Sequence, residues 1–260
     1  MVEVANPVWP ALCVRGLVKT YGQKTAVAGV DLDVAAGSFF GIVGPNGAGK
    51  TTTLRIATGL LRPDRGQVWV QGVDVWADPV EAKRRIGVLP EDLALFDRLT
   101  GRELLMFHGL LRNMPVDVVA DRSEQLLSLL GLADAGSTLV IDYSHGMRKK
   151  VALAAALLHG PQLLFLDEPF EAIDPVSARA IRAVLEQFTK SGLTIVFSSH
   201  VMELVERLCD HVAVMVGGVI RWVGPLDLLR GSGTLEDAFV ALVGEPSTTQ
   251  ELSWLESSHG

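Results

Sequence analysis

The residues best suited to chemistry form a glycine-rich loop between a predicted apolar strand, Phe39–Val43, and a predicted helix, Thr51–Leu61. The loop has the spacing GxxxxGK[ST] and consists of Gly44, Pro45, Asn46, Gly47, Ala48, Gly49, Lys50 and Thr51, followed by Thr52. Glycines let backbone N–H groups wrap closely around a phosphate, and a helix N-terminus adds positive potential. We expect Lys50 to reach the β and γ phosphates of a nucleotide and the Thr51 hydroxyl to bind Mg²⁺.

A second pattern supplies the acidic groups that a phosphate-bound Mg²⁺ requires. The apolar strand Leu163–Leu166 is followed directly by Asp167 and Glu168. We expect Asp167 to hold the metal through water and Glu168 to orient or deprotonate the attacking water. A glycine-rich turn, or two acids at a strand end, would each be ordinary alone. Together the two patterns predict a site for phosphoryl transfer.

The segments around these residues predict an α/β fold. Short strands separated by turn residues predict an N-terminal antiparallel sheet. These strands are Ala11–Val18, Val27–Val34, Ser38–Val43 and Gln67–Val70. After Leu93, leucines that recur every three or four residues predict a helical lobe. From Val151 onward, short apolar strands alternate with helices, which is typical of a parallel sheet covered on both faces.

The composition is that of an ordered globular protein. The 260 residues are 48% hydrophobic and 20% charged, with a formal net charge of −7. This acidic balance disfavours nucleic acid as a partner. The longest apolar runs, Val151–Leu158 and Val212–Ile220, are too short to cross a bilayer, and residues 1–17 lack the features of a secretory signal. We therefore expect a cytoplasmic protein in which Cys13 and Cys209 are buried small hydrophobes.

With the two nucleotide motifs in place, the chain from about Leu12 to Val243 resembles the nucleotide-binding subunit of ATP-binding cassette (ABC) transporters. The most specific match is Tyr143-Ser144-His145-Gly146-Met147, which resembles the family signature loop, usually Leu-Ser-Gly-Gly-Gln. The resemblance implies a P-loop NTPase core with a mostly parallel sheet, an N-terminal antiparallel β subdomain and an inserted α-helical subdomain at about 92–160. It also implies a single ABC ATPase domain over 1–243, followed by a polar C-terminal tail at 244–260.

The resemblance implies roles for residues outside the two motifs. In the family the signature loop contacts the γ-phosphate of ATP held by the opposite subunit, so Ser144 and Gly146 would act in trans. Tyr21 resembles the aromatic residue that stacks on adenine, and His200 resembles the catalytic switch histidine. Asp174 lies in a segment that resembles the family loop that touches the partner subunit. The residues themselves leave simpler roles open, because Ser144 and Asp174 also suit helix N-caps, and Tyr21 and His200 could be structural.

Three positions depart from the family pattern. His145 replaces the usual first glycine of the signature loop, and Met147 replaces its usual final glutamine. Glu91 stands where the family commonly has a glutamine that reaches Mg²⁺. A carboxylate can also ligate Mg²⁺. We therefore expect Glu91 to keep the metal contact and to change the charge near the γ-phosphate.

The resemblance implies an ATP hydrolase that powers export through a separate membrane permease. ATP and Mg²⁺ would be its cofactors, and two identical or paralogous subunits would close head-to-tail around two ATP molecules. The subunit would lie on the inner face of the cell membrane, bound through the permease near Leu93–Met106. The signature loop, the 90–92 segment and the 234–239 segment most resemble subunits of multidrug, antibiotic-resistance or sodium exporters.

Two other functions within the family stay open, and a third is disfavoured. An importer subunit would more often keep the glutamine and glycine that are missing here. A soluble ABC ATPase that acts on nucleic acid or ribosomes would generally carry a long coiled coil or two cassettes in one chain. A regulatory subunit that binds ATP without hydrolysing it would be expected to lose Glu168 or His200, and both are present.

Overall fold

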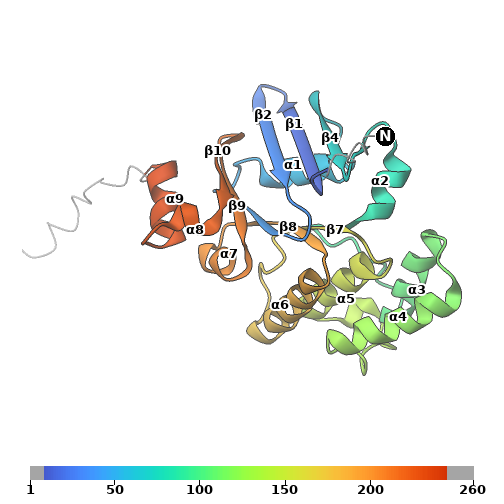
Figure 1. The fold of residues 1–260 in the computed structure, drawn as a ribbon. Helices are drawn as coiled ribbons and strands as arrows, with labels where there is room; N and C mark the ends of the chain where they lie inside the picture. The colour runs from blue at the N-terminus through green and yellow to red at the C-terminus, as the bar shows by residue number, and fades with distance from the viewer. Residues whose placement is uncertain (1–8, 245–260) are drawn as a thin grey trace, which may run out of the picture.

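Two β-sheets organise the chain, whose computed structural model describes residues 9–244 (Figure 1). The first sheet has four antiparallel strands in the order β2-β1-β4-β5. Its strands are β1 (Leu12–Tyr21), β2 (Lys24–Val34), β4 (Arg65–Val70) and β5 (Val73–Asp74). The predicted N-terminal antiparallel sheet is thus confirmed.

The second sheet has six strands in the order β10-β9-β3-β8-β7-β6. Its strands are β3 (Phe39–Val43), β6 (Ile86–Leu89), β7 (Leu163–Asp167), β8 (Thr194–Ser199), β9 (His211–Val216) and β10 (Val219–Pro225). All neighbours pair in parallel except β10, which runs antiparallel to β9. The sequence-based grouping of Ser38–Val43 with the N-terminal strands is wrong, because β3 pairs with β8 and β9 in this parallel sheet.

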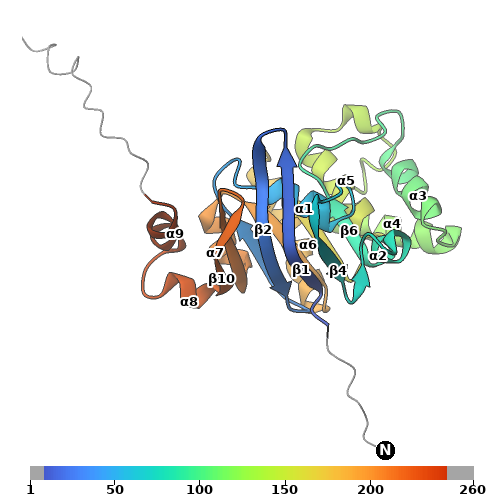
Figure 2. The same cartoon turned by 90° about the horizontal axis from the view of Figure 1, so that it is seen from above.

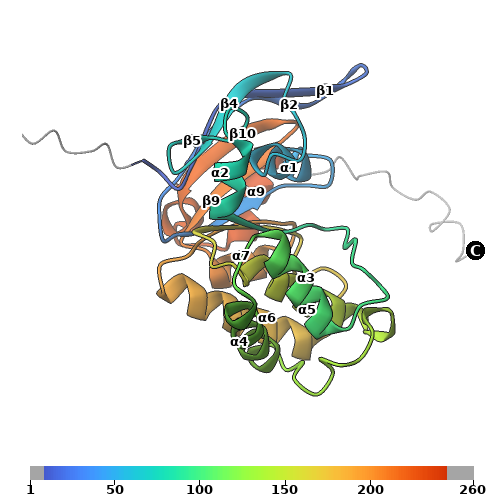
Figure 3. The same cartoon turned by 90° about the vertical axis from the view of Figure 1, so that its right-hand side faces the viewer.

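The helices fall on different sides of the two sheets (Figures 2 and 3). Their bounds are α1 (Lys50–Ala57), α2 (Pro79–Arg85), α3 (Gly101–Leu111), α4 (Val116–Leu129), the 3₁₀ turn η1 (Val140–Asp142), α5 (His145–Leu157), α6 (Pro175–Lys190), α7 (Met202–Leu208), α8 (Leu226–Arg230) and α9 (Leu235–Val243). Helix α1 lies beside the antiparallel sheet, whereas α3 to α6 gather on the opposite side of the parallel sheet (Figure 3). The elements between residues 101 and 157 are all helical, as the leucine spacing predicts.

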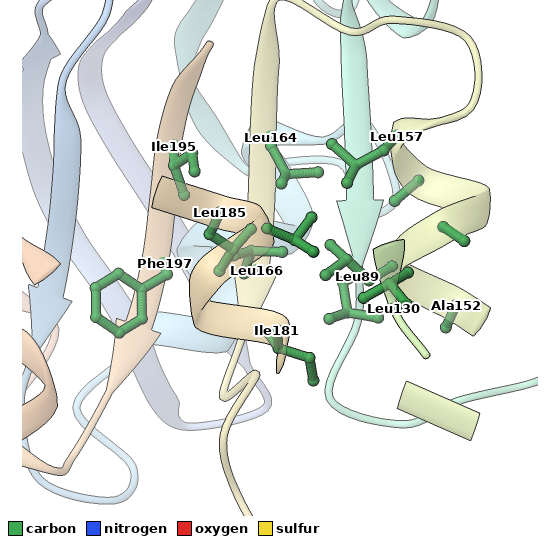
Figure 4. Packing of buried hydrophobic residues seen from close by; sticks show 14 of the residues in the cluster. Leu89, Leu130, Ala152, Leu157, Leu164, Leu166, Ile181, Leu185, Ile195 and Phe197 are labelled. Carbon is green, nitrogen blue, oxygen red and sulfur yellow. The ribbon is translucent and has the colours of Figure 1, made fainter. Parts of the chain in front are cut away.

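The core occupies both faces of the parallel sheet. One apolar cluster joins α1 to strands of both sheets, and the other joins the parallel sheet to α3, α4, α5 and α6. Figure 4 shows part of the second cluster, in which Leu164 and Leu166 of β7 lie close to Leu185 of α6. Every residue of β3, β7 and β8 is buried, which explains their uninterrupted apolar sequences.

Further expectations concern the cysteines, the membrane and the tail. Cys13 and Cys209 are both buried free thiols, as expected. Within residues 9–244, no helix is both long and apolar enough to span a membrane. Apart from Gly244, the C-cap of α9, the expected polar tail at 244–260 lies outside the described residues.

Candidate nucleotide site

The glycine-rich loop joins β3 to α1 and lines one side of a 390 Å³ cavity. Gly49 is the N-cap of α1 and has a φ of 108°, a left-handed conformation that favours glycine. A Cβ at Gly49 would also come within 2.3 Å of the Ala26 carbonyl oxygen. The loop can therefore follow this path only with glycine at this position, and it brings the start of α1 to the cavity.

Lys50 is the buried cation of the loop, with 6% of its surface exposed. Its Nζ donates a hydrogen bond to the Gly44 carbonyl oxygen at 2.8 Å and a longer one to that of Pro45 at 3.4 Å. It also lies 3.6 Å from Oε1 of Glu168. Gly44 and Pro45 thus hold the lysine through their carbonyls, and the ammonium group lies where it can reach an anion in the cavity.

Asp167 lies at the end of β7, with its carboxylate bonded to two hydroxyls. Its Oδ1 accepts hydrogen bonds from Ser198 Oγ at 2.6 Å and from Thr51 Oγ1 at 3.1 Å. Burial raises the pKa of Asp167, although these two hydrogen bonds oppose the rise. The two oxygens from Asp167 and Thr51 form the kind of ligand pair that Mg²⁺ binds together with phosphate oxygens and water.

Glu168 follows Asp167 and lies between two nitrogen-bearing side chains. Its Oε2 is 3.1 Å from Nδ1 of His200, and its Oε1 faces Lys50. Only 7% of Glu168 is exposed, and its φ of 45° places this non-glycine residue in the left-handed region. The backbone N–H of Glu168 donates to Ser198 Oγ at 3.0 Å. The carboxylate is therefore held at the cavity wall within reach of a bound phosphate or water.

Glu91 lies two residues after the end of β6 and also lines the cavity. Partial burial raises its pKa, and the negative charges of Asp167, Glu171, Asp92 and Glu168 raise it further. Such crowding of carboxylates favours the binding of a cation. The described residues nevertheless contain no group of three or more side chains that could hold a metal ion by themselves.

The cavity brings together most of the expected cradle residues with several that the sequence did not indicate. Its lining is Tyr21, Lys24, Ala26, Asn46, Gly47, Ala48, Gly49, Lys50, Thr51, Thr52, Glu91, Glu168, Glu171 and His200. Tyr21 is 50% exposed, and Lys19 Nζ lies 5.9 Å from the centre of its ring. Sequence reasoning missed Lys24, Ala26 and Glu171. The one available signal for Lys24 is its place across the hairpin from Tyr21.

Ser144, Gly146 and Asp174 do not line the cavity of this chain. Ser144 is the N-cap of α5, where its hydroxyl accepts from the Met147 N–H, and Asp174 is the N-cap of α6. A Cβ on Gly146 would approach Asp174 Oδ2 to 2.9 Å, so the starts of the two helices touch. The N-cap roles are therefore confirmed, and any phosphate contact by these residues would involve a nucleotide bound elsewhere.

Comparison with known protein families identifies the family of this chain. The family model for ABC transporters matches residues 27–171. The chain belongs to the ABC transporter family. As an ABC ATPase, it is an ATP-binding subunit that hydrolyses ATP. The resemblance found in the sequence and the fold expected from it are both confirmed.

Curated relatives include ABC subunits named for drug resistance. The linearmycin resistance ATP-binding protein LnrL of Bacillus subtilis is 36% identical over 81% of this chain and 68% of its own length. The daunorubicin resistance ATP-binding protein DrrA3 of Streptomyces coeruleorubidus is 38% identical over 85% and 70%. NatA of Bacillus subtilis, an ABC transporter ATP-binding protein, is 40% identical over 82% and 87%.

Solved ABC structures share the fold. An ATP-binding subunit of an ABC transporter superposes with a TM-score of 0.83 and 28% identity, covering 89% of this chain and 99% of that chain. CbiO1 from Clostridium perfringens, part of the ABC transporter complex CbiONQ, gives a TM-score of 0.74 and 26% identity, covering 84% and 90%. The cavity described above, which the glycine-rich loop lines, is therefore the candidate nucleotide site of this ABC ATPase.

Proposed function

We propose that this ABC subunit powers export through a permease on a separate chain, and that ATP closes it head-to-tail against a second ABC subunit. The observation that carries the proposal is the division of the expected site. Lys50, Glu168 and His200 meet at the cavity, whereas Ser144 and Gly146 lie outside it. The relatives named for linearmycin and daunorubicin resistance support export as the direction of transport.

In the proposed reaction, the glycine-rich loop and Lys50 bind the ATP phosphates, and the Tyr21 ring stacks on the adenine. Mg²⁺ fits beside Thr51 and Asp167, whose oxygens lie 3.1 Å apart, and Glu91 is proposed as a further contact. When bound, the metal would neutralise negative charge on the phosphate oxygens. The protein's own part is to hold these oxygens in place at a cavity wall.

Glu168 is proposed to orient the attacking water and to accept its proton. A carboxylate can do this only if it is ionised and within hydrogen-bond reach of the water. Lys50 lies 3.6 Å from one oxygen of the carboxylate and His200 lies 3.1 Å from the other, so both oxygens have a cationic or N–H partner at the cavity. We propose that His200 also contacts the γ-phosphate, because the histidine lines the same cavity and its side chain is 41% exposed.

The signature loop is proposed to complete the site of the second subunit. Ser144 supplies a hydroxyl and α5 supplies the N–H groups of a helix N-terminus, which suit an anion. Asp174 touches Gly146 and would meet the same partner. A second copy of this chain, or a paralogous subunit, would place its own loop at the cavity described here.

The permease is proposed to dock at a 710 Å³ groove between α2 and the end of α3. The exposed apolar side chains of Val80 and Leu111 border this groove together with the basic Lys83 and Arg84. An amphipathic helix that carries acidic residues would match both properties. The resemblance found in the sequence places the permease near Leu93–Met106. The first residues of this segment line a smaller cavity, which shares Val88 and Arg112 with the groove.

The test is light scattering during size-exclusion chromatography of Glu168→Gln, with and without MgATP. The amide keeps the shape of the carboxylate but cannot accept the proton, so ATP should bind and persist. We expect the measured mass to double when MgATP is present, and ATP turnover to fall by at least tenfold.

Glu186→Gln is the matched control, because Glu186 is an exposed glutamate on α6 that lies outside the cavity. It should hydrolyse ATP at the wild-type rate and show no lasting dimer. Wild-type turnover by Glu168→Gln would contradict the role of Glu168. Tight ATP binding by Glu168→Gln without any change in mass would contradict head-to-tail closure.

A further inference from the structure

Lys149 is a buried cation next to the catalytic segment, although it does not line the nucleotide cavity. It lies on α5, five residues after Ser144, and only 3% of its surface is exposed. Its Nζ donates hydrogen bonds to two backbone carbonyls, those of Glu168 at 2.9 Å and Glu171 at 2.8 Å. A buried ammonium group requires such partners, because an unpaired charge is costly away from water.

The segment that Lys149 contacts has an unusual backbone. Glu168 and Ala172 both adopt positive φ values, 45° and 54°, without being glycine. Non-glycine residues keep this conformation only where surrounding contacts hold them. The Glu171 N–H donates to the Glu168 carbonyl oxygen at 3.2 Å, which closes a tight turn. Lys149 binds the carbonyls at both ends of this turn.

The backbone of Glu168 is therefore held from both sides. Its N–H donates to Ser198 Oγ, and its carbonyl oxygen accepts from Lys149. Rotation of this peptide would move the carboxylate away from Lys50 and His200, which face its two oxygens. The negative charges of Glu171, Glu168 and Glu91 also favour the charged form of Lys149 and oppose the effect of its burial.

We propose that Lys149 is a positioning residue that sets the direction of the Glu168 carboxylate by binding the Glu168 and Glu171 carbonyls. The inference rests on the proposed function, because it assigns Lys149 an effect on hydrolysis through Glu168. Lys149 does not line the nucleotide cavity, so we assign it no direct contact with nucleotide. Its loss should slow the chemical step and leave nucleotide binding intact.

The experiment compares Lys149→Met with Lys150→Met in steady-state MgATP hydrolysis and in calorimetric titration with ADP. Methionine keeps the unbranched stem but removes the charge and the donors. We expect Lys149→Met to lower kcat at least tenfold with the ADP Kd within twofold of wild type. Lys150 is the matched control, since it is also buried on α5 and makes no hydrogen bond or ion pair within residues 9–244.

A double variant separates positioning from a general effect on the fold. If Lys149 acts through Glu168, then Glu168→Gln with Lys149→Met should hydrolyse ATP as slowly as Glu168→Gln alone. If the two substitutions lowered kcat independently, so that the double variant were slower than Glu168→Gln alone, the inference would be overturned. The variant Lys149→Arg restores a cation with several donors. Its kcat is expected to exceed half of the wild-type kcat.

The outcomes distinguish this inference from the proposed function. Wild-type kcat in Lys149→Met would overturn the role of Lys149 and leave the ATPase assignment untouched. Absence of MgATP hydrolysis by the wild-type protein would instead contradict the proposed reaction. Should Lys149→Met not fold, as judged by thermal unfolding, Lys149→Gln replaces it with one amide donor. It is expected to lower kcat at least fivefold, and wild-type kcat in that variant would overturn the inference.

Discussion

At the scale of single residues, Glu168 depends on contacts from several elements. Ser198 of β8 bonds both the Glu168 N–H and the Asp167 carboxylate, so one hydroxyl aligns two neighbouring acids. The parallel register of β7 and β8 pairs Asp167 directly with Ser198, which brings the Ser198 hydroxyl next to the end of β7. The two acids face different groups: Asp167 contacts Thr51, whereas Glu168 faces Lys50 and His200.

Glu91 provides the first prediction at this scale. Its carboxylate lines the cavity near Asp167, and we expect it to contribute charge to the Mg²⁺ site. Glu91→Gln removes that charge but keeps an oxygen ligand. The Mg²⁺ concentration that gives half-maximal ATP hydrolysis should rise severalfold, as measured by titration at fixed ATP.

Asp92→Asn is the control for Glu91→Gln. Asp92 neighbours Glu91 in sequence and pairs at 3.7 Å with Arg55, but it does not line the cavity. Because Asp92 adds only a longer-range charge, its substitution should change the Mg²⁺ dependence less than Glu91→Gln does. Identical curves for Glu91→Gln and wild type would contradict the metal contact.

The residues of the site were predictable where their type and spacing already indicate chemistry. Lys50, Asp167 and Glu168 belong to motifs whose spacing can be read along the chain, and the cavity brings Lys50 and Glu168 together, with Asp167 bonded to Thr51. Ser198 and Lys149 could not be found in this way. Each acts through a contact between elements distant in sequence, and neither residue type stands out where it occurs.

At the scale of elements, the sequence patterns predicted that segments such as β3 and β7 are strands, but they did not predict which strands these segments pair with. The apolar sequence of β3 correctly indicates a buried strand, but its closeness in sequence to β2 suggested the wrong sheet. Its partners β8 and β9 lie more than 150 residues later. Local periodicity carries no information about such distant pairing.

His159 is partly buried where α5 packs closely against β6. A Cβ on Gly87 would come within 2.3 Å of the Ala156 carbonyl oxygen, so helix and strand lie almost against each other. His159, just after α5, bonds the Ile86 carbonyl oxygen through Nε2 at 2.9 Å, while its buried Nδ1 has no partner within residues 9–244. Burial, followed by the charge of Arg112, lowers the pKa of His159 from 6.5 to about 4.

The lowered pKa predicts how stability depends on pH. Between pH 6.5 and 4 the unfolded chain binds a proton at His159 that the folded chain does not, so stability is complete above pH 6.5 and falls as pH drops towards 4. His159→Gln keeps an N–H donor but does not titrate. Between pH 7 and pH 4, wild type should therefore lose about 2–3 kcal/mol more unfolding free energy than the His159→Gln variant does. Urea unfolding at several pH values measures this, and parallel curves would contradict it.

At the scale of the whole molecule, the candidate nucleotide site lies where the two sheets meet. Gly218, in the turn between β9 and β10, accepts from the Ala28 N–H of β2 and donates to the Ala48 carbonyl oxygen of the glycine-rich loop. These two hydrogen bonds, 2.8 and 2.9 Å long, connect the antiparallel sheet to the cradle. The phosphate groups and the base would thus be bound by different sheets, with the relative position of the sheets determined by the backbone.

This division leads to a prediction for Tyr21, which ends β1 and lines the cavity from the antiparallel sheet. Tyr21→Ala removes the ring proposed to stack on adenine, a contact worth about 1–3 kcal/mol for a base, so the Kd for ATP should rise about 5- to 150-fold. Tripolyphosphate has no base, and its Kd should stay within twofold of wild type. Tyr21→Phe keeps the ring and should bind both ligands as wild type does. Calorimetric titration with each ligand tests this, and an equal loss of affinity for ATP and tripolyphosphate would mean that Tyr21 supports the cradle rather than the base.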